Sequence, residues 1–251
     1  MAGKVVLVTG AGRGIGRETA LTFAALGASV MGVSRTEGEL ADLAREAPVE
    51  YLAESVDTVE GCARIIDETR RRLGRIDILV NNAGVGSFRD SPIWDMSSEV
   101  WRETMATNLD GPFELTRLAI TDMIQRRWGR VVMVGSTAGQ FAWPAMSSYC
   151  ASKHGLLGLT RAVAQDVGAF DVTCNAVLPG WVRTKMSEAK AELEAARRGL
   201  TVEEVWEQWS AEYPQGRVVR PEEIANTIVF LASDSASGIN GEAITVALGL
   251  T

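Results

Sequence analysis

Metal-binding and redox side chains are scarce in this sequence. Its 251 residues include one histidine and three cysteines, which are too widely spaced for a zinc site or a redox pair: Cys62, Cys150 and Cys174. The formal net charge of -7 also gives no basic surface for nucleic acid. We therefore expect small-molecule chemistry in a reducing cytosol, with no metal site and no nucleic-acid partner.

Long apolar runs are missing as well. Glycine or polar residues interrupt every hydrophobic stretch, and residues 1–4 lead directly into a predicted strand without the pattern of a signal peptide. These features predict a cytoplasmic protein with no membrane segment. The hydrophobic content of 46% can nevertheless fill one substantial core, and no repeat or linker divides the chain. We expect a single domain over residues 1–251.

Short apolar, β-branched runs alternate with segments of helical period along the chain. This alternation is typical of βαβ units around a parallel sheet buried on both faces. Strands are predicted at residues 4–8, 29–33, 50–53, 78–81, 130–135, 172–177 and 243–246. The predicted fold is α/β, with one Rossmann-type doubly wound parallel sheet of about seven strands, helices on both faces and a ligand crevice at the carboxyl ends of the strands. The charged segment 185–213 interrupts the alternation and is predicted to be a helical substrate flap.

A glycine-rich turn follows the first predicted strand. It has the spacing T-G-x-x-x-G-x-G over residues 9–16, and helix-forming residues continue to Leu26. Glycines let the backbone approach a pyrophosphate closely, and free amides at a helix start favour its negative charge. The turn predicts a dinucleotide site, with a tight structural turn as the alternative. The candidate cofactor-binding residues are Gly10, Gly12, Arg13, Gly14, Ile15 and Gly16.

No acidic residue stands at the end of the second predicted strand. Ser34 and Arg35 lie there, about twenty residues past the glycines, where an acidic side chain normally binds the ribose hydroxyls of NAD(H). Arg35 can bind a 2′-phosphate through its planar guanidinium, and Arg13 can supply a second cation. NADP(H) is therefore favoured, and NAD(H) stays open because both arginines could be ordinary solvated surface residues.

Tyr149 and Lys153 lie four residues apart in a segment predicted to be helical from Ser147 to about Gly168. This spacing places both side chains on one helix face. A phenol with a pKa of about 10 is a poor base at neutral pH, but a nearby ammonium group favours its anion. The pair predicts general acid-base catalysis at an alcohol or carbonyl oxygen beside a nicotinamide. Taken alone, the spacing could also arise by chance in any helix.

Together these motifs resemble the short-chain dehydrogenase/reductase family over essentially the whole chain. The glycine turn is similar to the family's cofactor turn, residues 149–153 to its active-site motif, and residues 81–84 to its sheet-stabilising motif. The motifs also occur in the family's order. The resemblance includes 3-oxoacyl-carrier-protein reductase-like and carbonyl reductase-like members, and it implies an oxidoreductase acting on CH–OH groups.

The resemblance implies roles for further residues. Ser136 would hydrogen-bond the substrate oxygen, and Asn108 would support a helix bend and a water-linked proton path to Lys153. Lys153 would also hold the nicotinamide ribose, and the protein would assemble as a homotetramer. The residues implied to contact the cofactor beyond the glycine turn are Asn82, Ala83, Gly84, Tyr149, Lys153, Pro179, Gly180, Val182 and Thr184.

Three positions depart from the family pattern. Ser55 stands where the family usually has an Asp that contacts adenine, and Asp57 lies two residues further, so either residue could take that place. Residues 246–249 read Val-Ala-Leu-Gly instead of the common Val-Asp-Gly-Gly, which leaves the tetramer open. Reductases of carrier-protein thioesters often have a basic residue where Phe170 stands, and Arg127 is the only basic candidate left.

Several large aromatic side chains lie in the flap or in segments expected to follow strand ends: Trp94, Phe141, Trp143, Trp181, Trp206 and Trp209. Such side chains commonly line pockets for apolar ligands, and subunit packing is the alternative. His154 points about 100° away from Lys153 on a helix and is expected to be structural.

The predicted activity is reversible NADP(H)-dependent hydride transfer between a ketone and a secondary alcohol on a small, apolar or cyclic substrate. The predicted catalytic residues are Asn108, Ser136, Tyr149 and Lys153. Two alternatives within enzymes are an NAD(H)-dependent dehydrogenase of a hydroxylated small molecule and a 3-oxoacyl thioester reductase. A third alternative is a catalytically silent dinucleotide-binding regulatory protein, whose expected mark, a broken Ser-Tyr-Lys set, is absent here.

Overall fold

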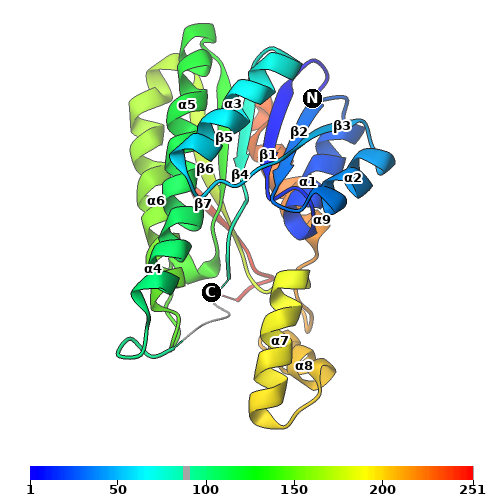
Figure 1. Cartoon of the computed structure of the whole chain (residues 1–251), viewed down its shortest axis with the longest axis vertical. Helices are drawn as coiled ribbons and strands as arrows, with labels where there is room; N and C mark the ends of the chain where they lie inside the picture. The colour runs from blue at the N-terminus through cyan, green and yellow to red at the C-terminus, as the bar shows by residue number, and fades with distance from the viewer. Residues whose placement is uncertain (87–90, 251) are drawn as a thin grey trace.

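The computed structural model describes residues 1–86 and 91–250 and is built around a parallel β-sheet (Figure 1). The described strands form one seven-stranded sheet in the order β3-β2-β1-β4-β5-β6-β7, and every pair of neighbours is parallel. The strands are β1 (Val5–Thr9), β2 (Ser29–Ser34), β3 (Val49–Ala53), β4 (Ile78–Asn81), β5 (Gly129–Val134), β6 (Val172–Pro179) and β7 (Ala243–Val246). The predicted strands are confirmed, with ends that differ by at most two residues.

The interior strand β1, which pairs with β2 and β4, shows why the sheet is buried on both faces. All of its residues are buried, and successive side chains of a strand point to opposite faces. Val6 and Val8 accordingly pack in one hydrophobic cluster, while Leu7 packs in the other. A strand placed between two apolar layers needs apolar residues on both of its faces, and Val5–Val8 are all apolar.

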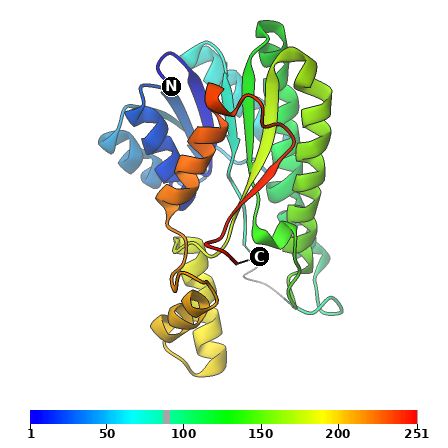
Figure 2. The ribbon, with the colours of Figure 1, turned by 180° about the vertical axis from the view of Figure 1, so that it is seen from behind.

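Helices cover both faces of the sheet, as Figures 1 and 2 show from opposite sides. One layer contains α1 (Gly14–Ala25), α2 (Glu37–Glu46) and α9 (Pro221–Leu231), which contribute Phe23, Leu40 and Ile228 to the cluster of Val6. The other layer contains α3 (Val59–Leu73), α5 (Gly111–Arg126) and α6 (Ser147–Val167), which contribute Ile65, Leu115 and Leu156 to the cluster of Leu7. The fold is therefore α/β of the doubly wound Rossmann type.

The remaining helical segments are short. The helix α4 (Ser98–Met105) continues through a π-helical turn, Ala106–Asp110, into α5, and 3₁₀ turns occur at Thr137–Gly139, Gly168–Phe170 and Asp234–Ala236. Among the residues that the structure describes, no helix combines the length and the apolar character needed to span a bilayer.

The flap consists of two helices, α7 (Lys185–Arg198) and α8 (Val202–Ala211), which extend beyond the sheet (Figure 1, yellow). Thr184 and Thr201 begin these helices with capping boxes, and Gly199 ends α7 in the left-handed conformation with φ of 68°. The flap has a small core of its own, in which Ala191, Ala195 and Val205 pack with Trp206 and Trp209. The predicted helical flap is confirmed, as a helix pair.

Candidate active site

A cleft of about 850 Å³ lies at the carboxyl ends of the strands. It includes the place where the strand order reverses, between β1 and β4, at which doubly wound sheets bind their ligands. Strand ends, the glycine turn, the start of α6, the loop after β6 and the flap all contribute to its walls. Every site residue predicted from the sequence lines this cleft except Gly16 and Asn108, which are buried behind its wall.

The glycine turn joins the end of β1 to the start of α1. A Cβ atom on Gly16 would lie 2.3 Å from the carbonyl oxygen of Gly10, so only glycine permits this close packing of turn and helix. Gly10 itself has φ of 66°. The N-cap residue, Arg13, makes no side-chain capping bond, and the first turn of α1 contains no acidic residue. The amides at the start of α1 are therefore available for an anion, and the turn fits a pyrophosphate.

The segment after β4 is fixed to the end of β1 by hydrogen bonds. The side chain of Asn82 donates to the Thr9 carbonyl at 2.8 Å, and the Thr9 hydroxyl accepts from the backbone amides of Asn82 and Ala83, each at 3.0 Å. In the preceding strand position, Asn81 Nδ2 donates to the Thr116 hydroxyl at 3.0 Å. These bonds hold the two strand ends at a fixed separation, and Asn82, Ala83 and Gly84 form the floor of the cleft between them.

Tyr149 and Lys153 both project into the cleft from the first turns of α6. The ammonium of Lys153 lies 5.8 Å from the centre of the Tyr149 ring and donates a hydrogen bond to the Val134 carbonyl at 2.9 Å. Lys153 is only 5% exposed, and this burial lowers the pKa of its ammonium to about 8, because the charged form loses hydration. At neutral pH the side chain stays largely protonated and its charge acts close to the phenol.

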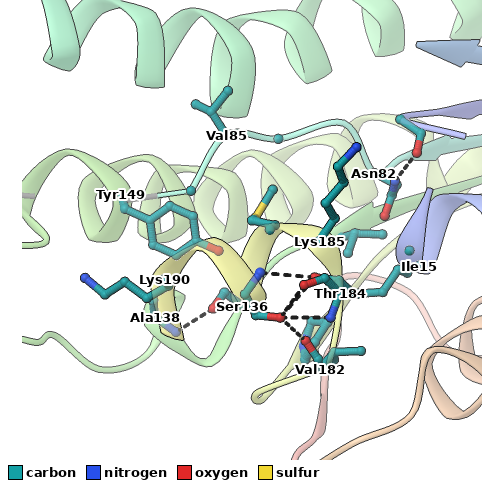
Figure 3. Close-up of a pocket in the computed structure, with 18 of the residues that line it drawn as sticks. Ile15, Asn82, Val85, Ser136, Ala138, Tyr149, Val182, Thr184, Lys185 and Lys190 are labelled. Atoms are coloured by element: carbon teal, nitrogen blue, oxygen red, sulfur yellow. Dashed lines mark hydrogen bonds between the residues drawn. The ribbon is translucent and has the colours of Figure 1, made fainter. Parts of the chain in front are cut away.

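Ser136 follows β5 and faces the same part of the cleft as Tyr149 (Figure 3). Its hydroxyl oxygen accepts a hydrogen bond from the backbone amide of Ala138 at 3.1 Å. The bond fixes the oxygen while leaving the hydroxyl proton available for donation to a ligand.

Asn108 lies within the π-helical turn between α4 and α5 and is 1% exposed. Its carboxamide exchanges two hydrogen bonds with the backbone of Val85, at 2.8 and 3.1 Å, and donates to the Ser152 hydroxyl at 3.2 Å. A Cβ atom on Gly84 would lie 3.3 Å from Asn108 Oδ1 and 3.8 Å from Lys153 Nζ, so Gly84 separates the two side chains. Asn108 is thus placed beside Lys153 but does not face the cleft.

The loop after β6 rests against the glycine turn. A Cβ atom on Gly14 would meet the Thr184 methyl group at 3.1 Å, and one on Gly180 would lie 2.5 Å from the Tyr213 hydroxyl oxygen. Pro179, Gly180, Val182 and Thr184 all line the cleft, as expected. Val182 is further held by a bridge to Val219 and by the Ser187 hydroxyl, which donates to its carbonyl at 2.5 Å.

The end of the cleft beside β2 contains both cations and an acid. Arg13, Ser34 and Arg35, which were predicted to bind the cofactor, all line this end. Arg13, however, is paired with Glu39 at 3.4 Å, a partner that the sequence did not suggest. Ser55 also lines this end, whereas Asp57 is not among the described residues that do. Of the two residues considered for the adenine contact, Ser55 is therefore the one that the structure places in the cleft wall.

The aromatic candidates separate into two groups. Trp143, Trp181 and Trp209 line the cleft, and the rings of Trp181 and Trp209 are stacked with centroids 4.0 Å apart. Trp206 instead packs edge-on against Trp209 inside the flap. Trp94, Phe141 and Trp206 are not among the cleft-lining residues, and neither is His154, whose ring contacts the Cys150 carbonyl. In the described part of the chain, no three metal-ligating side chains gather into a possible metal site.

The chain is similar in sequence to known proteins over nearly its whole length. A family model described as enoyl-(acyl carrier protein) reductase matches residues 10–251. The 3-oxoacyl-acyl-carrier-protein reductase of Escherichia coli is 35% identical over 255 residues, covering 99% of this chain and 97% of the relative. The enzyme of that name from Thermotoga maritima is also 35% identical, with coverage of 99% and 98%.

Solved structures are also similar to this chain over nearly its whole length. A variant of actinorhodin polyketide ketoreductase with NADPH superimposes with a TM-score of 0.94 at 32% identity, covering 100% of this chain and 99% of that one. Levodione reductase gives a TM-score of 0.93 at 30% identity, with coverage of 99% and 98%.

Proposed function

Because the chain belongs to the short-chain dehydrogenase/reductase family, we propose that it is an NADP(H)-dependent oxidoreductase that interconverts a ketone and a secondary alcohol. The observation that carries the proposal is a single cleft in which Ser136, Tyr149 and Lys153 face the uncapped start of α1. The cofactor, when bound, supplies or accepts the hydride at its nicotinamide ring.

In the proposed reaction, different side chains donate the proton and stabilise the charges that develop. In reduction, Tyr149 donates its hydroxyl proton to the substrate oxygen, and the charge of Lys153 stabilises the phenolate that results. Ser136 donates a hydrogen bond to the same oxygen and stabilises its developing negative charge. The Val134 carbonyl accepts a hydrogen bond from one N–H of the Lys153 ammonium, so the other two N–H groups remain to face Tyr149 and the cofactor ribose. Asn108 supports this arrangement from behind through Val85 and Ser152.

Replacement of the proton donor tests the activity. We expect Tyr149→Phe to lower kcat for ketone reduction at least about 100-fold, because general acid-base catalysis commonly contributes that much. Tyr51→Phe, on β3 and outside the cleft-lining set, is the matched control and should keep full turnover. The assay follows NADPH absorbance at 340 nm with a panel of ketones. Full turnover by Tyr149→Phe would overturn the proposal.

The preference for NADP(H) over NAD(H) is proposed from the cations at the end of the cleft beside β2. This end would hold the ribose with the 2′-phosphate, and we call it the ribose end. Arg13 and Arg35 line this end, and a ketoreductase of similar structure was solved with NADPH. An NAD(H)-dependent dehydrogenase of a hydroxylated compound is the alternative. Dissociation constants of the purified protein for NADPH and NADH decide between them, and equal constants or tighter NADH binding would contradict the NADP(H) preference.

We further propose a free, apolar or cyclic ketone as substrate, because Trp143, Trp181 and Trp209 line the cleft. A 3-oxoacyl thioester is the second candidate, favoured by the names of the curated relatives. Arg127, the basic residue considered for a carrier protein, stands before β5 at the far end of the sheet and donates to the Ala169 carbonyl. The ratio of kcat/KM for a cyclic ketone and for a 3-oxoacyl thioester separates the candidates.

Assembly and location stay predictions. A homotetramer and a cytoplasmic protein are expected for this chain, and both bear on how the cleft is used. Light scattering of the purified protein tests the first, and a monomer would reject it.

A further inference from the structure

Glu39, near the start of α2, sits between two cations that come from distant parts of the chain. Its Oε1 atom lies 3.4 Å from Arg13 Nη1 and 3.2 Å from Lys185 Nζ. Arg13 belongs to the glycine turn and Lys185 is the first residue of α7. The carboxylate is more enclosed than its partners, with 23% of its side chain exposed against 51% for Arg13 and 71% for Lys185.

The second oxygen of this carboxylate faces the ribose end of the cleft. A Cβ atom on Gly12 would lie 3.1 Å from Glu39 Oε2 and 2.9 Å from Ser34 Oγ. The carboxylate therefore packs closely against Gly12 of the glycine turn, where any side chain would collide with Glu39 and Ser34. Glu39 lines the cleft together with Ser34 and Arg35.

A negative charge at this place has opposite consequences for the two forms of the cofactor. A 2′-phosphate would be repelled by Glu39 and would find Arg13 and Lys185 already paired. A free 2′-hydroxyl carries no charge and can donate a hydrogen bond to the carboxylate, as the acidic residue of an NAD(H) site does. The ribose end thus combines groups that attract a phosphate with one that opposes it.

We propose that Glu39 is a specificity-determining residue that weakens discrimination in favour of the 2′-phosphate. The inference rests on the proposed dinucleotide site but concerns a residue outside the predicted set. Binding of the phosphorylated form exchanges the Glu39 carboxylate for the phosphate as the partner of Arg13 and Lys185. Lys185 extends from the start of α7 (Figure 3), so this exchange also removes an ion pair that ties the flap to α2.

Two fragments that lack the nicotinamide isolate the effect: adenosine 2′,5′-bisphosphate and AMP, which differ only by the 2′-phosphate. Binding is measured by titration calorimetry at fixed ionic strength. Glu39→Gln keeps the shape of the side chain and removes its charge. We expect it to tighten binding of the bisphosphate about threefold to tenfold while changing AMP binding less than about twofold.

Glu37→Gln is the matched control, because it makes the same charge change in the first turn of α2 at an exposed residue outside the cleft-lining set. Lys185→Met is the second variant, and we expect it to weaken the bisphosphate about threefold with little effect on AMP. Equal changes for both fragments in Glu39→Gln, or a change no larger than that of Glu37→Gln, would overturn the inference. Fragment binding needs no turnover, so a protein without reductase activity can still pass or fail this test.

Discussion

The glycine turn and the flap form facing walls of one cleft, but different kinds of contact hold them. The turn is held by contacts to its backbone: the Gly16 backbone packs on the Gly10 carbonyl, and the Asn82 side chain donates to the Thr9 carbonyl, which ties the end of β1 to the end of β4. The flap is fixed by side chains, including the stacked rings of Trp181 and Trp209. Its core is also separate from the two clusters that bury the sheet. We infer that the sheet with the helices packed on it, called the frame below, holds the proposed cofactor site rigidly, whereas the flap can move separately as a wall of the cleft.

The largest effect on stability is expected from a substitution that disrupts the glycine turn. Gly16→Ala would place a methyl group against the Gly10 carbonyl, where neither backbone segment can move freely. We expect a loss of about 3 kcal/mol in unfolding free energy, together with a loss of cofactor binding. Thermal and urea denaturation measure the first, and titration of NADPH the second.

Gly158→Ala is the control for this change. Gly158 lies on α6, and a Cβ atom there would meet nothing within 4 Å. The substitution should stabilise the helix by about 0.5–1 kcal/mol. If Gly16→Ala also left the unfolding free energy undiminished, the glycine turn would not be a rigid element.

The frame also contains a buried cation, the ammonium of Lys153. Its contribution to the free energy of unfolding depends on pH. Lys153 has a folded-state pKa of about 8, lowered by burial from 10.5. Between these values the unfolded chain binds more protons, so the unfolding free energy contributed by this group rises as pH increases from 8 toward 10.5. Relative to Lys153→Met, the wild-type protein should gain up to about 3 kcal/mol over this range.

Denaturation of both proteins at pH 7 and at several alkaline values checks this difference, with Tyr149→Phe present in both so that the phenol beside Lys153 does not contribute; titrating groups that do not interact with Lys153 cancel in the comparison. If the difference in unfolding free energy between the two proteins did not change with pH, the ammonium of Lys153 would be better hydrated than its burial indicates. A difference of the opposite sign would require a native anion beside Lys153 in the unliganded protein.

The frame was largely predictable from sequence, whereas the side-chain contacts of the flap were not. Strand periodicity and the glycine spacing are local patterns, and they predicted the sheet and the turn after β1, while the four-residue spacing of Tyr149 and Lys153 predicted the pair on α6. The partnership of Glu39 and Lys185 joins residues 146 positions apart, which no local pattern encodes. Trp206 and Trp209 lie three apart on one helix, so spacing alone could not show that Trp206 packs inside the flap while Trp209 lines the cleft.

Loss of the stacked rings of Trp181 and Trp209 should weaken substrate binding more than cofactor binding. Trp209→Ala removes the contacts of this ring with Trp181 and Trp206, and we expect KM for an apolar ketone to rise about tenfold. NADPH affinity should change less than about twofold, because the glycine turn keeps its own contacts. Steady-state kinetics and cofactor titration measure the two effects.

The matched control is Trp94→Ala, since Trp94 is 81% exposed and is not among the described cleft-lining residues. It should leave KM unchanged. An equal rise in KM for both variants would remove the argument for Trp209 as a pocket wall.

The smallest effect is expected where the flap helices are joined by exposed charges. Arg183 pairs with Glu188 on α7 at 2.7 Å and with Glu203 on α8 at 2.8 Å, and it lies over the Trp206 ring. Because these charges are solvated, Arg183→Met should cost less than about 1 kcal/mol of unfolding free energy. Hydrogen exchange should nevertheless become faster in α8 and stay unchanged in α1, since local opening of the flap does not require the sheet to unfold. Arg71→Met, which breaks an exposed pair within α3, should leave exchange in the flap unaltered. If Arg183→Met instead lowered the melting temperature of the whole protein and accelerated exchange in α1, flap and frame would unfold as one unit.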